Sequence, residues 1–190
     1  MNKQNKSYEI IRRLSKCKNN SERKTKLLKI LKKMEHDSNR NLITQKIEID
    51  KNFGDFNFIL KSKFKRVLLL TAHYDAYLLN EKSGETTPDA NDNASGVGIL
   101  IESILQLKKF PVDFVFFGAE EKGCLGALQF LKENRKNILG IINLDCCGSG
   151  GEKGILVPEK IKVKNKFLKT DKKLNFLFIE QIKKEIINTA

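Results

Sequence analysis

The stretch RVLLLTAHYD, residues 66–75, joins a nearly unbroken apolar run to a polar end. Strands that are covered on both faces of a sheet read as continuous apolar runs and not as alternating ones. The run Val67–Ala72 therefore predicts a buried strand of a largely parallel sheet. His73 and Asp75 follow it, so both residues are expected at the carboxyl end of this strand.

Two further apolar runs end in the same way. Val112–Gly118 is followed by Glu120 and Glu121, and Ile138–Leu144 is followed by Asp145. In open α/β sheets the ligand crevice lies beyond the carboxyl ends of the strands. We therefore expect these three carboxylates to meet the histidine of the first run in one crevice.

The segment PDANDNASG, residues 88–96, adds Asp92 just before a helical pattern. An imidazole and four or five carboxylates in one crevice would repel one another and stay partly protonated unless a cation were present. A bound divalent ion removes that repulsion, and zinc takes histidine nitrogen and carboxylate oxygen as ligands. The sequence therefore predicts a divalent metal site.

The remaining pattern predicts a sheet flanked by helices. Ile43–Ile49 and Phe53–Leu60 alternate apolar and polar residues, which indicates an antiparallel pair at a sheet edge. From Val67 onward strands alternate with helical patterns, as in right-handed βαβ units. We expect an α/β fold, a three-layer α/β/α sandwich with a mixed, mostly parallel sheet. The expected helices are Ser7–Leu14, a second helix capped by Ser21, Ala94–Lys108, Lys122–Asn134 and Leu174–Ile187, and Tyr77–Pro88 is expected to be a polar loop.

Length, composition and charge narrow the class of protein. The chain has 190 residues, 40% of them hydrophobic, which predicts a globular protein. No apolar stretch approaches the roughly 20 residues of a membrane span, and residues 1–20 lack an apolar signal segment. The formal charge of +13 allows a nucleic-acid partner, but only six of the 36 basic residues are arginine and the lysines spread over the whole chain. We expect neither nucleic acid nor membrane as a partner.

The four cysteines are Cys17, Cys124, Cys146 and Cys147, and none belongs to a CxxC pair. This spacing predicts reduced thiols in a cytoplasmic protein. The last three are expected to be small buried apolar residues.

Four segments together resemble the M28 family of zinc aminopeptidases. They are TAHYD (71–75), PDANDNASG (88–96), FGAEEKGCLGA (117–127) and INLD (142–145), in the family's order and approximate spacing. The resemblance covers roughly residues 46–148. Any one of these motifs would be weak alone, whereas the set is specific.

The resemblance implies a metal centre of four residues. His73 and Asp145 would bind a first zinc, Glu121 would bind a second, and Asp92 would bridge the two ions. The implied cofactor is Zn²⁺, as one or two ions.

The resemblance also implies two catalytic residues. Glu120 would be the general base that takes a proton from the attacking water. Asp75 would accept a hydrogen bond from the imidazole of His73 and fix its tautomer.

One ligand of the family has no counterpart here. The family's second zinc takes a late histidine, but the histidines of this chain are His36 and His73, both before Asp145. Three interpretations remain open: a truncated or fragmentary domain, a substitute ligand, or a catalytically inactive relative. The substitutes considered are Asp171, Glu180, a thiol of Cys146 or Cys147, and water.

The leading hypothesis is a cytoplasmic zinc aminopeptidase that releases N-terminal residues from peptides with water activated at the metal. Residues 1–40 would form an N-terminal helical segment packing on the domain, and residues 41–190 an M28-like peptidase domain that is C-terminally shortened. The alternatives are an inactive M28-like protein that binds metal or peptide, and a glutaminyl-cyclase-like enzyme, because glutaminyl cyclases share this fold. Substrate residue preference and oligomeric state stay open.

Overall fold

The chain is described by a computed structural model that covers residues 6–48, 55–134, 137–148, 160–163, 166–169, 171–173 and 175. It divides into two compact units, Met1–Ser149 and Gly150–Ala190. All four segments that resemble the M28 family lie in the first unit. Among the described residues, no helix combines the length and the apolar character that a bilayer span requires.

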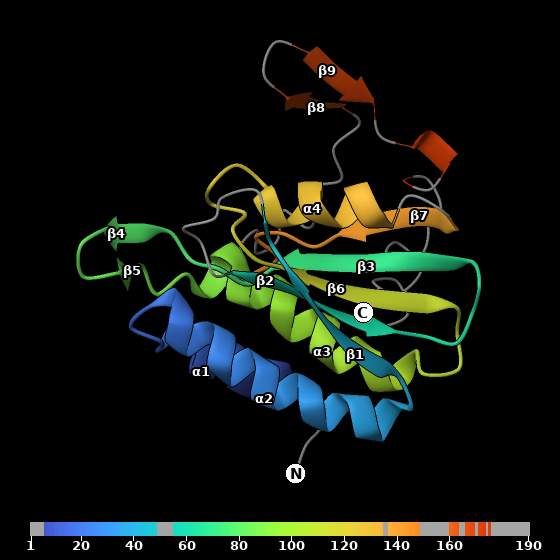
Figure 1. The fold of residues 1–190 in the computed structure, drawn as a ribbon, viewed down its shortest axis with the longest axis horizontal. Coiled ribbons are helices and arrows are strands. Elements are labelled where there is room, and N and C mark those ends of the chain that lie inside the picture. The colour runs from blue at the N-terminus through green and yellow to red at the C-terminus, as the bar shows by residue number, and fades with distance from the viewer. Residues whose placement is uncertain are drawn as a thin grey trace, which may run out of the picture. The chain divides into compact units, whose positions relative to one another are not determined.

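A five-stranded mixed sheet forms the centre of the first unit (Figure 1). In spatial order its strands are β1 (Asn41–Lys46), β2 (Phe56–Lys61), β6 (Val112–Phe117), β3 (Val67–His73) and β7 (Ile138–Asn143). β2 is antiparallel to both β1 and β6, whereas β3 is parallel to its two neighbours, β6 and β7. The expected antiparallel pair at the sheet edge and the mixed α/β fold are both confirmed.

Helices cover both faces of this sheet. α1 (Lys6–Ser15), α2 (Asn20–Ser38) and α3 (Gly96–Gln106) lie on one face, and α4 (Leu125–Glu133) lies on the other (Figure 1). The three layers are therefore those expected. α1 and α2 belong to the same unit as the sheet, and the domain boundaries at residues 40 and 41 stay a prediction.

Side chains on both faces of β6 explain its continuous apolar run. Phe114 and Phe116 pack into the larger core cluster together with Leu100 of α3. Val115 points to the other face and packs with Phe130 of α4. Burial of an aromatic side chain of this size contributes about 1.5–3 kcal/mol, so both cores fix the register of the strand.

The structure differs from the expected helix boundaries at three places. Asn19, and not Ser21, caps α2, because its side-chain oxygen accepts the backbone N–H of Glu22 at 2.9 Å. α4 begins at Leu125, three residues later than expected, after a left-handed residue at Cys124 (φ 60°). α3 is preceded by an irregular helical turn, η2 (Ala90–Ser95), and begins only at Gly96.

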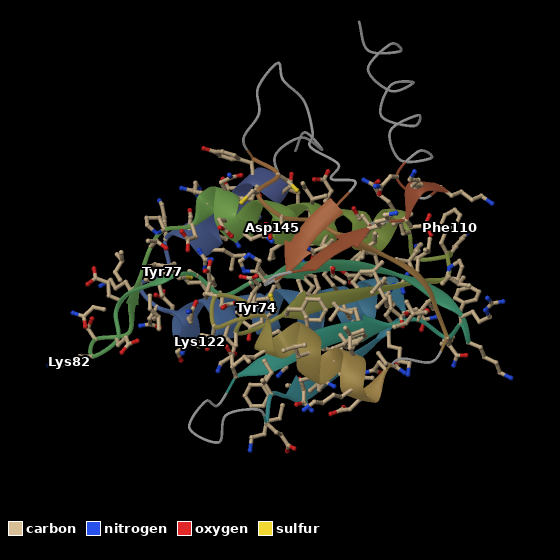
Figure 2. The ribbon with its side chains drawn as sticks, turned by 90° about the horizontal axis from the view of Figure 1, so that it is seen from above. Tyr74, Tyr77, Lys82, Phe110, Lys122 and Asp145 are labelled. Carbon is tan, nitrogen blue, oxygen red and sulfur yellow. The ribbon has the colours of Figure 1, made fainter. Side chains whose placement is uncertain are left out.

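The segment expected to be a polar loop contains a short hairpin. β4 (Leu78–Asn80) and β5 (Glu85–Thr86) pair in antiparallel fashion, with Lys82 at the far tip in Figure 2. The turn has Gly84 at φ 69°, and the side chain of Asn80 accepts the N–H of Lys82 at 2.9 Å. Such turn chemistry supports a hairpin without any apolar periodicity.

The second unit contains one described hairpin, of β8 (Lys160–Val163) and β9 (Lys166–Lys169), which pair in antiparallel fashion. The helix expected at Leu174–Ile187 and the possible ligand Glu180 lie almost entirely outside the described residues.

Two side chains at the start of α2 form hydrogen bonds with the backbone after β3 and before η2. Arg23 is 1% exposed and donates to the carbonyl of Pro88 at 2.8 Å and to that of Tyr74 at 3.4 Å. Asn20 exchanges two hydrogen bonds with the backbone of Ala76, at 2.8 and 2.9 Å. Burial lowers the pKa of Arg23, although nearby carboxylates oppose that shift. The N-terminal helices therefore help to position the residues after β3 and before η2.

Candidate metal centre

The carboxyl ends of three parallel strands bring the candidate residues together. β3 ends at His73, β7 ends two residues before Asp145, and β6 ends three residues before Glu120. Figure 2 shows Tyr74 and Asp145 toward one end of the sheet and Phe110, which precedes β6, at the opposite end. This arrangement is the crevice that the strand pattern predicted.

His73 points from the end of β3 toward two carboxylates. Its side chain is 3% exposed, and its Nε2 lies 2.9 Å from Asp92 Oδ1 and 3.6 Å from Asp145 Oδ1. These two distances link the end of β3 to η2 and to the segment after β7. The structure thus brings together the three residues assigned to a first zinc.

Two sets of potential ligands share Asp92. Among the described residues, ligand atoms of His73, Asp92 and Glu121 lie within 4.8 Å of one another, and so do those of Asp92, Asp145 and Cys146. Imidazole nitrogen, carboxylate oxygen and thiolate sulfur are the ligands that zinc takes in proteins. A carboxylate with two oxygens can serve both sets at once. The residues therefore fit zinc at one or two neighbouring positions.

Asp75 holds the loop that carries Glu120 and Glu121. It is 2% exposed, and its two oxygens accept the backbone N–H groups of Glu120 at 3.0 Å and Glu121 at 3.1 Å. Its Oδ1 also lies 3.6 Å from His73 Nδ1, an ion-pair distance. The hydrogen bond expected from the imidazole is not formed, because His73 Nδ1 is buried without a hydrogen-bond partner. Asp75 instead holds the backbone of both glutamates and faces the histidine as a charge.

Replacing Asp75 with asparagine should lower kcat about 10–100-fold with a much smaller change in KM, because an amide can accept only one of the two N–H groups. Asp113→Asn is the matched control: Asp113 is a buried carboxylate of β6 that also accepts a backbone N–H, from Ser62 at 2.6 Å, away from the site. Steady-state kinetics of both variants check the prediction. Equal losses in the two variants would assign the effect of Asp75 to folding alone.

A clamp that the sequence did not reveal joins η2 to the segment after β7. Asn93, fully buried, donates to the carbonyl of Leu144 at 2.8 Å, and its side-chain oxygen accepts the N–H of Gly96 at 3.0 Å. A Cβ on Gly96 would lie 2.5 Å from that same oxygen, so only glycine fits there. Asn93 binds the carbonyl of a residue 51 positions away, and a hydrogen bond to a distant backbone group leaves no signal in the sequence.

The cysteines near the site are exposed and not buried as expected. All four cysteines are free, and Cys124, Cys146 and Cys147 are exposed. The thiol of Cys124 donates to Glu120 Oε1 at 3.3 Å, which places it beside the proposed general base. Cys124 has a left-handed backbone before α4, and Cys146 and Cys147 follow the end of β7. None of the three belongs to either core cluster.

The pKa values of the site reflect its crowded charges. Burial lowers the pKa of His73, but contacts with Asp145 and Asp75 outweigh burial and raise the pKa to about 11. Burial, followed by repulsion from Asp92, raises the pKa of Glu121 to about 7. The contact with His73 lowers the pKa of Asp145. Without a metal, His73 and Glu121 therefore hold their protons more strongly than usual. A bound cation would reverse both shifts, because it favours the neutral imidazole and the ionised carboxylate.

Metal-free protein should lose stability as the pH rises from about 5 to about 8. The stabilisation from protonated His73 is complete below its ordinary pKa of 6.5 and is lost as the pH rises toward its folded pKa of about 11. Ionised Glu121 disfavours the fold from its ordinary pKa of 4.5 up to about 7. Melting temperatures in chelator across this range test the prediction, and a rise with pH would contradict it. Zinc-saturated protein should not show the decline, because the cation favours the ionised carboxylate.

An apolar cleft adjoins the charged residues. It has a volume of about 230 Å³ and lies between α4 and the β3–β7 side of the sheet. Its apolar wall includes Phe117, Phe130 and Ile141, and its polar side includes His73 and Glu120. An apolar side chain of a ligand can therefore enter beside the reacting groups.

Comparison with known proteins identifies the family of this chain. The chain is 36% identical over 100 residues to the aminopeptidase YwaD of Bacillus subtilis. The matched region makes up 48% of this chain but only 20% of that protein. The fold resembles a leucine aminopeptidase precursor from Bacteroides thetaiotaomicron, with a TM-score of 0.60, 22% identity, and coverage of 76% of this chain and 62% of that one. It also resembles a glutaminyl cyclase from the same organism, with a TM-score of 0.58, 23% identity and the same coverage of both chains. Peptidase family M28 matches residues 58–186, more than half of the sequence, and the chain therefore belongs to that family.

Proposed function

We propose that this protein is a zinc-dependent aminopeptidase that hydrolyses the N-terminal peptide bond of free peptides. The observation that carries the proposal is that His73, Asp92 and Glu121 form one set of potential ligands, and that Asp145 lies 3.6 Å from His73 Nε2 in the same crevice. The aminopeptidase and zinc metalloprotease names of its relatives support the same reaction. We propose two zinc ions, because Asp92 belongs to both sets of ligands.

Each residue then has a distinct task. His73, Asp92, Asp145 and Glu121 would hold the metal, which supplies Lewis acidity and a lowered pKa for water. Glu120 would take the proton of the attacking water and deliver it to the leaving amine. Asp75 keeps Glu120 in place through the backbone N–H groups described above.

The charge of the site favours substrates with a free N-terminus. Bound metal would neutralise the carboxylates of Asp92, Glu121 and Asp145, and Glu120 would remain as a negative charge that a positively charged α-amino group can approach. The apolar cleft next to them favours a substrate whose first residue is apolar. We propose cytoplasmic peptides as substrates, in keeping with four free thiols.

Turnover of leucine p-nitroanilide by zinc-reconstituted protein tests the proposal, with N-acetyl-leucine p-nitroanilide as the blocked control. Aminopeptidase activity predicts zinc-dependent release from the first compound and none from the second. Because the fold also resembles a glutaminyl cyclase, a peptide beginning with glutamine is included, and mass spectrometry distinguishes cyclisation from cleavage. Cyclisation without cleavage, or equal release from the blocked substrate, would overturn the proposal.

A further inference from the structure

We propose that the thiolate of Cys146 is a metal ligand, and that together with Asp92 and Asp145 it forms a second cation position next to the one at His73. The inference deepens the proposed function and rests on the metal centre described above. Its basis is the second set of ligand atoms, those of Asp92, Asp145 and Cys146, which lie within 4.8 Å of one another.

The segment that carries Cys146 is fixed on both sides. Asn93 donates to the carbonyl of Leu144, two residues before it. Ser95 Oγ accepts the N–H of Cys147 at 3.0 Å, and Asn91 Oδ1 accepts the N–H of Gly148 at 2.7 Å. All three bonds come from η2, the same turn that carries Asp92. These bonds hold the backbone around Cys146 next to the turn that carries Asp92. The thiol of Cys146 therefore lies near the Asp92 carboxylate without a movement of the loop.

The distances suit coordination by one ion. Bonds of about 2.3 Å from zinc to sulfur and about 2.1 Å to oxygen separate two tetrahedral ligands by roughly 3.6 Å. Because the ligand atoms lie within 4.8 Å of one another, each separation exceeds the coordinated distance by at most about an ångström. Side-chain rotation alone covers that difference, because Cys146, Asp92 and Asp145 all have exposed or partly exposed side chains.

The neighbouring cysteine provides a contrast. Cys147 is also exposed, but its Sγ contacts the backbone carbonyl of Asp145 at 3.6 Å and it belongs to neither set of ligands. The two adjacent thiols therefore differ in what they face: Cys146 faces two carboxylates, and Cys147 faces the main chain.

The chemistry of this set selects the class of cation. One thiolate with two carboxylates favours zinc, cobalt or cadmium over magnesium or calcium, which prefer oxygen alone. On binding, the sulfur–hydrogen bond of Cys146 breaks, a sulfur–metal bond forms, and the proton passes to the buffer. A binding step that releases a proton and ignores magnesium is therefore expected.

Cobalt(II) is the probe that tests the inference, because a thiolate bound to cobalt gives a strong charge-transfer absorption in the near ultraviolet. The wild-type chain, Cys146→Ser and Cys147→Ser are each titrated with cobalt, and bound cobalt is counted by metal analysis. Wild-type protein and Cys147→Ser should bind about two ions, as paired sites do, and show the band. Cys146→Ser should lose the band completely and bind about one ion. Circular dichroism of all three proteins confirms that each is folded.

Cobalt bound by the wild-type chain without the band, or a band that disappears in Cys147→Ser but persists in Cys146→Ser, would overturn the role of Cys146 alone. Failure of the wild-type chain to bind cobalt at all would overturn the metal centre and the proposed function with it. Excess magnesium should leave the band unchanged, and its loss in magnesium would also contradict a thiolate site.

Discussion

Replacing Glu120 with glutamine should lower kcat for leucine p-nitroanilide by about 10²–10⁴-fold while the zinc content stays the same. The amide fills the same space but cannot take a proton from water. Glu120 borders the cleft, and its backbone N–H is held by Asp75, so the substitution leaves the loop in place. Steady-state kinetics and metal analysis of one sample check both parts of the prediction.

Glu121→Gln is the matched control, because the two glutamates are adjacent and their backbone N–H groups share the same carboxylate partner. It should bind less zinc, since Glu121 belongs to a set of ligands and Glu120 does not. If both variants kept full turnover, neither the base nor the ligand assignment would stand. If Glu120→Gln lost zinc and Glu121→Gln did not, the two roles would be reversed.

Zinc should stabilise the fold strongly. Selective binding to the native state adds about 4 kcal/mol when free zinc is a thousandfold above its Kd. For a domain of this size each kcal/mol raises the melting temperature by roughly 2–4 °C, so a total rise of roughly 8–16 °C is expected. The physical reason is that the ion removes the repulsion among Asp92, Glu121 and Asp145. Thermal melts with and without zinc measure the shift.

His73→Ala is the control for that measurement. It removes the imidazole that faces both Asp92 and Asp145, so most of the zinc-dependent rise should disappear. A melting curve that zinc leaves unchanged in the wild-type chain would contradict the site. An equal rise in the variant would place the stabilising zinc elsewhere.

The architecture of the first unit could be predicted because β3 and β6, in the middle of its sheet, are largely buried on both faces. β3 and β6 are therefore continuous apolar runs, and the polar residues directly after such runs lie at the sheet's carboxyl edge by topology alone. His73, Glu120 and Asp145 needed no further information to be placed in one crevice. The hairpin of β4 and β5 was missed because side-chain and glycine turn geometry supports it, without apolar periodicity.

The contacts that hold the site in place could not be predicted, because they join side chains to backbone groups far away in the sequence. Arg23, Asp75 and Asn93 act through hydrogen bonds to the backbone of distant residues, and such bonds impose no spacing on the sequence. The exposure of Cys146 and Cys147 was missed because a cysteine has no fixed preference once it follows a strand end. Composition suggested small buried residues, whereas both thiols are exposed after β7, with Cys146 near two carboxylates and Cys147 against the main chain.

Zinc content and leucine p-nitroanilide turnover, recorded on one zinc-reconstituted sample of the wild-type chain, test the metal centre and its activity together. We expect about two zinc ions per chain and turnover that a chelator abolishes and added zinc restores. A chain that binds no zinc, or that binds zinc without releasing p-nitroaniline, would contradict the assignment of His73, Asp92, Glu120, Glu121 and Asp145 to an aminopeptidase centre.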